Sequence, residues 1–409
     1  MAASSLPLSG VRVLDVSSVI AGPYCSYQLA QMGAEVIKVE NPAAPDAARR
    51  QGADAALNAI GMGASYLGLG AGKRAVTLNL KHADGQALFL RLAETAHVVL
   101  ENFRPGVMER LGLGYEALRA RRPGLVYCAI SGFGQDGPWS DKPAYDQIVQ
   151  GLSGAMATTG DAASGPFRAG YPVCDTVAGL TAAFAIAAAL ARQAREQAAG
   201  QGGAGELIDV SMLDAQLSIM GWATSNWLVG RQPQRLLGNH NPSASPSGTF
   251  RAADGPINVA ANMQPQFEAF CRVVGRPELI ADPRFPDFEG RIAHRDALTA
   301  ALEEALAARP GAEWVETLNA AGVPAGLVLG LDEAAESPPV RHRGSVRRIA
   351  DVPGVARPID VFTAGYRTSA GAPAAGNAPP RLGQDTDAVL RELGCSAEEI
   401  AAFREDGAI

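Results

Sequence analysis

Asp175 is the residue of this chain best placed to do chemistry. It follows a turn containing Gly170 and Pro172 and precedes a run of mostly Ala, Leu, Ile and Phe over 181–195. Because Ala and Leu are strong helix formers, the pattern predicts a buried helix that begins near Asp175. The free N–H groups and positive dipole end of that helix favour an ionised carboxylate. An ionised carboxylate in a partly desolvated pocket can act as a nucleophile.

Two simpler interpretations of this segment compete with the nucleophile. Asp is a preferred N-cap residue, so Asp175 could serve only to cap the helix. Cys174 could itself be a nucleophile, but it has no plausible His partner nearby and buried Cys is usually a small apolar residue. The five cysteines are scattered without a CxxC pair, which predicts reduced thiols in a cytoplasmic protein. The five histidines lack metal-ligand spacing, so we expect no metal site.

Composition narrows the class of protein. The chain has 409 residues, 47% of them hydrophobic, which is enough for two or more domains with their own cores. Its formal net charge of −7 gives no electrostatic footprint for nucleic acid. Residues 1–7 lack the pattern of a secretory signal. The apolar run after Asp175 carries Arg192 and Arg195, so we expect a core helix rather than a membrane span.

Alternating strands and helices are expected to position Asp175. Strands are predicted at 11–16, 35–40, 76–80, 98–101, 125–130 and 207–210, with helices at 24–32, 84–95, 115–120 and 212–228. This βαβ pattern predicts a doubly wound, Rossmann-like parallel sheet with ligands at the carboxyl ends of its strands. The first turn has no GxGxxG, so NAD binding, with Glu40 on a ribose, is disfavoured.

Two segments carry groups that suit a phosphorylated adenosine. Lys73–Lys81 brackets a predicted strand with cations, and Glu101–Gly106 places an amide, an aromatic ring and a guanidinium after another strand, with Arg110 following. The alternative is that these cations are solvated surface charges.

Composition also divides the chain. We predict a large α/β domain over 1–200, a helix and an Asn-, Pro- and Ser-rich linker over 201–247, and a small α+β domain over 248–330. The small domain is expected to hold a hairpin at 249–260 and helices at 264–274, 292–308 and 312–321. Residues 331–409 are expected to be a return linker and the C-terminal part of the large domain, with a Pro-rich, extended stretch over 338–380 and a helix over 387–393.

Taken together, these motifs resemble the class III CoA-transferase family, which includes formyl-CoA, carnitine and dicarboxylate CoA-transferases and α-methylacyl-CoA racemases. The resemblance covers nearly the full length and rests on Leu14-Asp15 with Ala21-Gly22-Pro23, the segments 33–40, 73–81 and 101–106, Ser131-Gly132-Phe133-Gly134, Tyr145-Asp146, Asp175 and Leu382–Thr386.

The resemblance implies a role for each matched residue. Asp175 matches the family's catalytic aspartate, which forms an aspartyl anhydride and then an aspartyl-CoA thioester. No cofactor is bound permanently, and CoA or acyl-CoA is a substrate. The family's CoA contacts carry over to Val19, Ile20, Leu78, Lys81, Asn102, Phe103, Arg104, Arg110 and Tyr145. The family fold is an interlocked, ring-like homodimer with a smaller α+β domain in each subunit, and no membrane partner is implied.

Departures from the family pattern bear on the substrate. Racemases place a His where this chain has Tyr145, and a phenol with an ordinary pKa of about 10 is a poor base. Formyl-CoA:oxalate enzymes carry a Gln at the position of Ile20 and a glycine-run loop, which 238–242 lacks. These departures favour transfer from a donor such as succinyl-CoA to a larger, short-chain (hydroxy)dicarboxylate.

Three hypotheses therefore stand beside the favoured one: formyl-CoA:oxalate transfer, α-methylacyl-CoA racemisation, and acyl-CoA binding without catalysis. His240 could contact the acceptor, and Arg168 or Arg235 could pair with its distal carboxylate.

Overall fold

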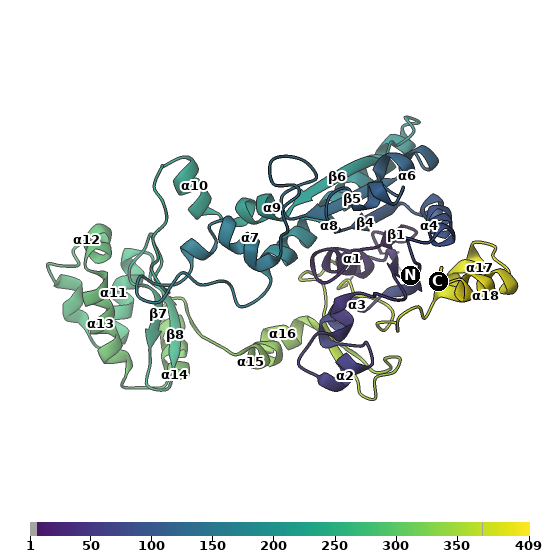
Figure 1. Cartoon of the computed structure of the whole chain (residues 1–409). Coiled ribbons are helices and arrows are strands. Elements are labelled where there is room, and N and C mark those ends of the chain that lie inside the picture. Colours follow the sequence, from purple (N-terminus) through teal and green to yellow (C-terminus); the bar gives the residue numbers. More distant parts are fainter. Residues whose placement is uncertain (1–5, 370) are drawn as a thin grey trace. The chain divides into compact units, whose positions relative to one another are not determined.

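The computed structural model describes residues 6–369 and 371–409 (Figure 1). Residues 1–5, part of the stretch considered above for a secretory signal, lie outside the described residues. Internal contacts divide the chain into two compact units. The large unit comprises Met1–Ala155, Arg168–Val229 and Pro338–Ile409, and the small unit comprises Met156–Phe167 and Gly230–Ser337.

A six-stranded, fully parallel sheet forms the centre of the large unit. Its strands lie in the order β3-β2-β1-β4-β5-β6, with bounds β1 (Arg12–Asp15), β2 (Glu35–Glu40), β3 (Lys73–Thr77), β4 (Val98–Glu101), β5 (Val126–Ser131) and β6 (Glu206–Ser211). This order is that of doubly wound α/β folds, in which successive strands are added to one side of β1 as far as β3 and to its other side from β4 onwards. The structure thus confirms the mixed α/β fold with its parallel sheet.

Side chains alternate between two cores because successive residues of a strand point to opposite faces. Val13 of β1 belongs to the core under α1 (Ala21–Gln31) and α8 (Val173–Ala198), whereas its neighbour Leu14 belongs to the core under α4 (Ala83–Thr95). The C-terminal helices α17 (Thr386–Glu392) and α18 (Ala397–Glu405) cover that second face (Figure 1).

The remaining elements of the large unit connect these layers. They are η1 (Ala47–Arg50), α2 (Ala55–Ala59), α3 (Ala64–Gly70), α5 (Val107–Arg110), α6 (Tyr115–Arg121), α7 (Asp146–Leu152), α9 (Met212–Ile219), α10 (Trp222–Leu228), α16 (Pro338–Arg343), β10 (Val346–Ile349) and β11 (Ile359–Phe362).

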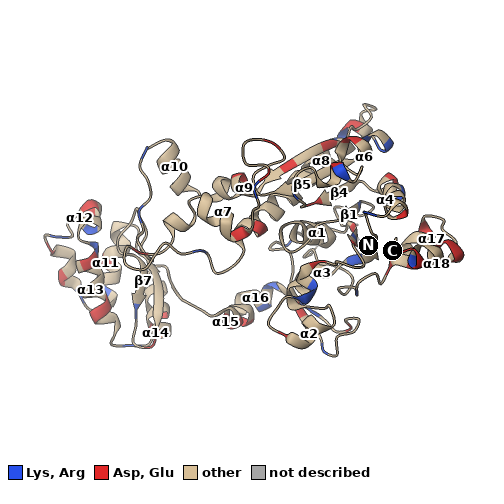
Figure 2. Ribbon diagram, in the orientation of Figure 1, with Lys and Arg blue, Asp and Glu red and all other residues tan. Residues whose placement is uncertain are grey.

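The small unit is an α+β fold around its own apolar core. Its antiparallel sheet consists of β7 (Ser247–Arg251), β8 (Pro256–Ala260) and β9 (Ala325–Leu327), so the predicted hairpin is confirmed. Its helices are η2 (Met156–Thr158), α11 (Gln264–Val273), η3 (Pro277–Ala281), α12 (Phe288–Ala293), α13 (Arg295–Leu306), α14 (Gly311–Ala320) and α15 (Leu331–Glu336). Phe267, Phe270 and Trp314 fill the core. Figure 2 shows acidic and basic residues interspersed on helices of both units.

Three predicted elements were wrong in extent. The third strand runs from Lys73 to Thr77 rather than from 76 to 80. The single helix predicted over 212–228 is two helices, broken at Gly221, where φ is +56°. The return segment is not wholly extended, since it contains α16 and the antiparallel pair β10–β11.

Helix α8 is also less buried than its composition predicts. A helix that is apolar all round is normally enclosed by protein. Ala178, Ala182 and Ile186 do lie in the core, but Leu180 and Phe184 are exposed in this chain. With 26 residues and a mean hydropathy of 1.8 over its most apolar window, α8 is, among the described residues, the one helix long and apolar enough to cross a membrane.

Candidate active site

Asp175 lies in the first turn of α8, as predicted, but it does not cap that helix. The cap position is Pro172, and the carboxylate of Asp146 at the start of α7 supplies the acceptor instead. Asp146 Oδ1 accepts a hydrogen bond from Cys174 N at 2.8 Å and a longer one from Asp175 N at 3.4 Å. Within residues 6–369 and 371–409, no donor is bonded to the carboxylate of Asp175 itself. The half-buried oxygens of Asp175 are therefore available to a ligand.

The ionisation of Asp175 differs from the prediction. Burial, and secondly the nearby charge of Asp146, raise the pKa of Asp175 to about 7. The expected preference for the ionised form at the helix N-terminus is therefore wrong in direction. The first free N–H groups already bond Asp146, whose negative charge opposes the dipole.

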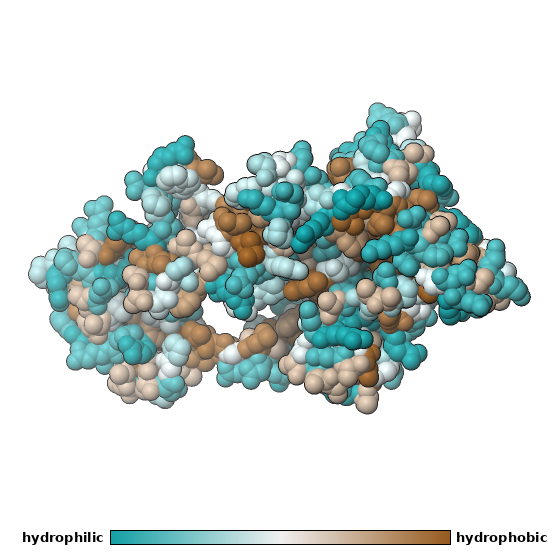
Figure 3. Space-filling model, viewed as in Figure 1, coloured by the Kyte–Doolittle hydropathy of each residue, from teal (hydrophilic) through white to brown (hydrophobic). Residues whose placement is uncertain are grey.

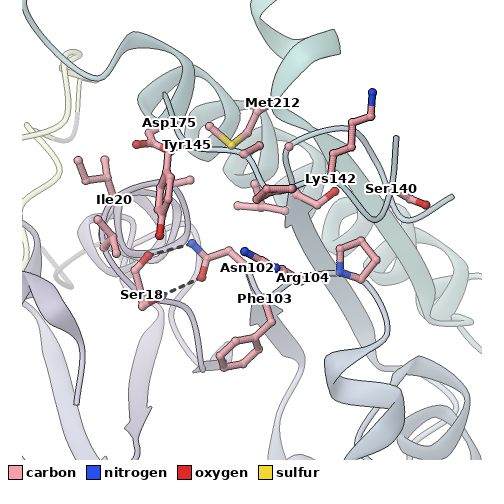
Figure 4. Close-up of a pocket in the computed structure, with 18 residues that line it drawn as sticks. Ser18, Ile20, Asn102, Phe103, Arg104, Ser140, Lys142, Tyr145, Asp175 and Met212 are labelled. Carbon is pink, nitrogen blue, oxygen red and sulfur yellow. Dashed lines mark hydrogen bonds between the residues drawn. The ribbon is translucent and has the colours of Figure 1, made fainter. Parts of the chain in front are cut away.

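A cavity of about 250 Å³ lies beside Asp175 (Figure 4). Its lining comes from six parts of the large unit: the turn after β1, the segment after β4, the end of β5 with Gly132, the loop before α7, the start of α8, and Met212 of α9. Seven of the predicted site residues line it, namely Asp175, Val19, Ile20, Asn102, Phe103, Arg104 and Tyr145. The parallel sheet brings the first two of these segments together, because β1 and β4 are neighbours.

Close helix packing brings the turn after β1 near Asp175. Gly179 is one helical turn beyond Asp175, and a Cβ atom there would lie 2.4 Å from the carbonyl oxygen of Ala21. Only glycine permits this approach of α8 to the start of α1. The spacing between Asp175 and residues 18–21 therefore depends on Gly179.

A second cavity, of about 440 Å³, lies at the carboxyl ends of β1, β2 and β3. Leu78 and Lys81 line it, and Ser18 and Phe103 line both cavities. Glu40 also lines it, but its carboxylate is bound by Arg49 through Nε–Oε1 at 2.8 Å and Nη2–Oε2 at 2.7 Å. The ribose contact considered for Glu40 would have to displace this buried ion pair.

The remaining predicted contacts lie elsewhere. Arg110 is in α5, outside the linings of both cavities. Arg168 is an exposed residue of the large unit, and its Nη1 donates to the carbonyl of Ala169 at 3.4 Å. His240 belongs to the small unit, where burial, and secondly Arg295, lower its pKa.

Sequence reasoning missed three residues at this site. Lys142 and Ser140 line the first cavity from the loop before α7, and Lys142 adds a cation to that of Arg104 (Figure 4). Asp146 holds the first turn of α8. All three lie in or next to the charged loop around Tyr145-Asp146, which the sequence shows. No local pattern in that loop indicates contact with α8, which starts 27 residues after Asp146.

The family is decided by comparison with known proteins. The pattern of CoA-transferase family III matches residues 8–386. The chain belongs to CoA-transferase family III. This protein is therefore an enzyme, and the site described above lies in its large unit.

Relatives of this CoA-transferase span nearly its whole length. An acetyl-CoA:oxalate CoA-transferase of Acetobacter aceti is 38% identical, over 95% of this chain and 96% of the relative. A succinate–glutarate CoA-transferase of Agrobacterium fabrum is 35% identical, again over 95% and 96%. The crystal structure of a CAIB/BAIF family protein from Brucella suis has a TM-score of 0.84 at 31% identity, covering 95% of this chain and all of that one (100%).

Proposed function

We propose that this enzyme moves CoA from an acyl-CoA donor, with succinyl-CoA favoured, to a short-chain dicarboxylate or related carboxylate, with Asp175 as the nucleophile. The observation that carries the proposal is the free, half-buried carboxylate of Asp175 beside a cavity lined by Asn102, Arg104 and Tyr145. Relatives named for transfer to oxalate and to glutarate support the reaction class and leave the chain length of the acceptor to be measured.

The proposed reaction needs only exchanges at acyl carbon. The Asp175 carboxylate attacks the thioester carbonyl, the C–S bond breaks, and an aspartyl anhydride and CoA thiolate result. The thiolate attacks the aspartyl carbonyl, which releases the donor acid and leaves an aspartyl-CoA thioester. The acceptor carboxylate and then the returning thiolate reverse these two steps. No net proton is consumed. The CoA thiolate is the leaving group of the first and third steps and the nucleophile of the second and fourth.

We assign the coenzyme to both cavities of the large unit. Lys81, Arg104 and Lys142 supply cations suited to its phosphates, and Val19 and Ile20 line the first cavity together with Asp175. Leu78, Asn102, Phe103, Arg110 and Tyr145 remain proposed contacts. Arg168 and His240 are proposed to contact the acceptor carboxylate.

A labelling experiment in deuterated water tests the proposal. The protein is incubated with [¹⁴C]succinate, oxalate or glutarate and with succinyl-CoA, acetyl-CoA or 2-methylacyl-CoA. Label in a new thioester without α-deuterium is the expected outcome. Deuterium at the α-carbon without label transfer would indicate a racemase instead, and neither signal would indicate binding alone.

The pH dependence of transfer should report the ionisation of Asp175. Only the carboxylate attacks, and the pKa of Asp175 in the free enzyme is raised to about 7, first by burial and then by Asp146. We therefore expect kcat/KM to fall about tenfold per pH unit below pH 7 and to level off above it. In Asp146→Asn, which removes the neighbouring charge, the midpoint should move to lower pH. An unchanged midpoint would contradict this assignment.

We also propose a homodimer, interlocked as in the family. The outer face of α8 and the exposed Trp222, Trp227 and Val229 in and after α10 leave apolar surface uncovered in the single chain. Figure 3 shows brown, hydrophobic surface of this kind where Figure 1 places α7, whose Ile148 and Leu152 are about half exposed. Light scattering should give about twice the chain mass of 42.3 kDa, and a monomeric mass would contradict the dimer.

A further inference from the structure

Val19 has a backbone conformation that valine normally avoids. Its φ is +67°, and among residues 6–369 and 371–409 the only other non-glycine residue with positive φ is Arg231. The left-handed region is unfavourable for β-branched residues, so other contacts must hold Val19 there. Val19 lies in the turn of residues 17–20, which joins β1 to α1.

Three different side chains hold successive peptide groups of this turn. Lys38 Nζ donates to the carbonyl of Ser17 at 2.8 Å. Asn102 binds both sides of Ser18, accepting from its N–H at 2.8 Å and donating to its carbonyl at 2.9 Å. Val19 N–H donates to Asp46 Oδ1 at 3.0 Å. Asp46 is thus the residue that accepts a hydrogen bond from the strained residue itself.

Asp46 is rigidly placed for this task. Its side chain is 2% exposed, and Oδ2 forms an ion pair with Lys38 Nζ at 2.9 Å. Oδ1 accepts a second hydrogen bond from Ala48 N at 3.0 Å, because Asp46 also caps η1. Lys38 contacts both Asp46 and Ser17, so one buried network fixes the turn and the residue that restrains it.

The turn separates the two cavities. Val19 and Ile20 line the cavity of Asp175, Asp46 lines the other cavity, and Ser18 lines both. A change in the conformation of Val19 would therefore move the wall against which a thioester beside Asp175 must lie.

We propose that Asp46 is a positioning residue: by binding the N–H of Val19 it holds the left-handed turn that orients the acyl-CoA thioester towards Asp175. The inference rests on the proposed CoA-transferase function. It assigns Asp46 no contact with the reacting atoms. Asn102 acts in the same way on Ser18, since both ends of its amide are engaged by the turn.

A double-mutant cycle with Val19→Gly tests this role. In the wild-type background, Asp46→Ala should lower kcat/KM for succinyl-CoA about 20-fold, since a displacement near 1 Å can cost about 100-fold. In the Val19→Gly background, the same change should cost no more than about 3-fold, because glycine adopts positive φ without a restraining partner. Equal losses in both backgrounds would show that Asp46 only supports the fold and would overturn the proposal.

Two further variants separate positioning from stability. Asp46→Asn keeps an acceptor oxygen for Val19 N–H but removes the charge that pairs with Lys38. It should recover most of the activity lost in Asp46→Ala while its melting temperature still falls. Asp54→Ala is the matched control, because Asp54 caps α2 in the same way but lines neither cavity. Its kcat/KM should stay within about 2-fold of the wild-type value.

Crystal structures of the Asp46→Ala variant test the conformation of the turn whether or not the enzyme transfers CoA. Absence of transfer in the wild-type protein would defeat the proposed function but not the conformational claim. In crystals of Asp46→Ala, Val19 should leave the left-handed region and residues 18–20 should shift. A turn that retains positive φ at Val19 without Asp46 would overturn the inference.

Discussion

Replacing Asp175 by asparagine is expected to lower kcat for CoA transfer by at least about 10³-fold. The amide keeps the shape of the side chain but cannot exchange as a carboxylate, so no anhydride forms. The coenzyme cavities are built from other residues, and CoA should therefore bind within about 3-fold of its wild-type affinity. Steady-state transfer assays and calorimetric titration with CoA measure the two effects separately.

Asp214→Asn is the matched control for this substitution. Asp214 lies in the first turn of α9, as Asp175 lies in the first turn of α8, but it is exposed and lines neither cavity. Its transfer rate should be unchanged. Asp175→Ala guards against deamidation of the new asparagine. If the alanine variant retained more than about a tenth of the activity, another residue would have to be the nucleophile.

Arg49→Ala is expected to cost about 3–5 kcal/mol in the free energy of unfolding of the large unit. Arg49 and Glu40 form a bidentate, buried pair whose side chains are each 2% exposed, and the guanidinium lies 3.8 Å from the ring centre of Tyr66. Without Arg49, the Glu40 carboxylate stays buried but loses the two hydrogen bonds and the positive charge of its partner. Urea unfolding monitored by circular dichroism measures the loss.

Arg74→Ala provides the comparison. Arg74 makes ion pairs with both Glu35 and Glu392, at 2.8 and 2.7 Å, but these carboxylates are 36% and 44% exposed. Water replaces such partners, so the expected cost is no more than about 1 kcal/mol. If the two substitutions lowered the free energy of unfolding equally, burial of the Arg49–Glu40 pair would not explain its contribution to stability.

Much of the large unit could be predicted because its strands are short apolar runs separated by helical patterns. The misplaced strand shows the limit of that reasoning. Lys73 and Arg74 look like a charged boundary, yet both lie inside β3. Lys73 is buried against Asp15 at 3.2 Å, and Arg74 pairs with a residue of the C-terminal segment. A partner distant in sequence thus makes Lys73, an apparent surface charge, an interior one, whereas Arg74 stays partly exposed.

The candidate site, too, could be predicted only in part. Six of the predicted residues line one cavity with Asp175, because neighbouring parallel strands end at one edge of the sheet, whereas Arg110, Arg168 and His240 line neither cavity. The state of Asp175 could not be predicted, since it depends on burial and on Asp146 from another helix. The left-handed conformation of Val19 could likewise not be predicted, because no local sequence pattern indicates a valine with positive φ whose N–H binds Asp46.

Trapping the covalent intermediate shows directly whether Asp175 is the nucleophile. The enzyme is incubated with succinyl-CoA, quenched with hydroxylamine, digested and analysed by mass spectrometry, with Asp175→Asn treated in parallel. We expect a hydroxamate on Asp175 in the wild-type protein and none at that position in the variant. Rapid CoA transfer with an unmodified Asp175 would contradict this role.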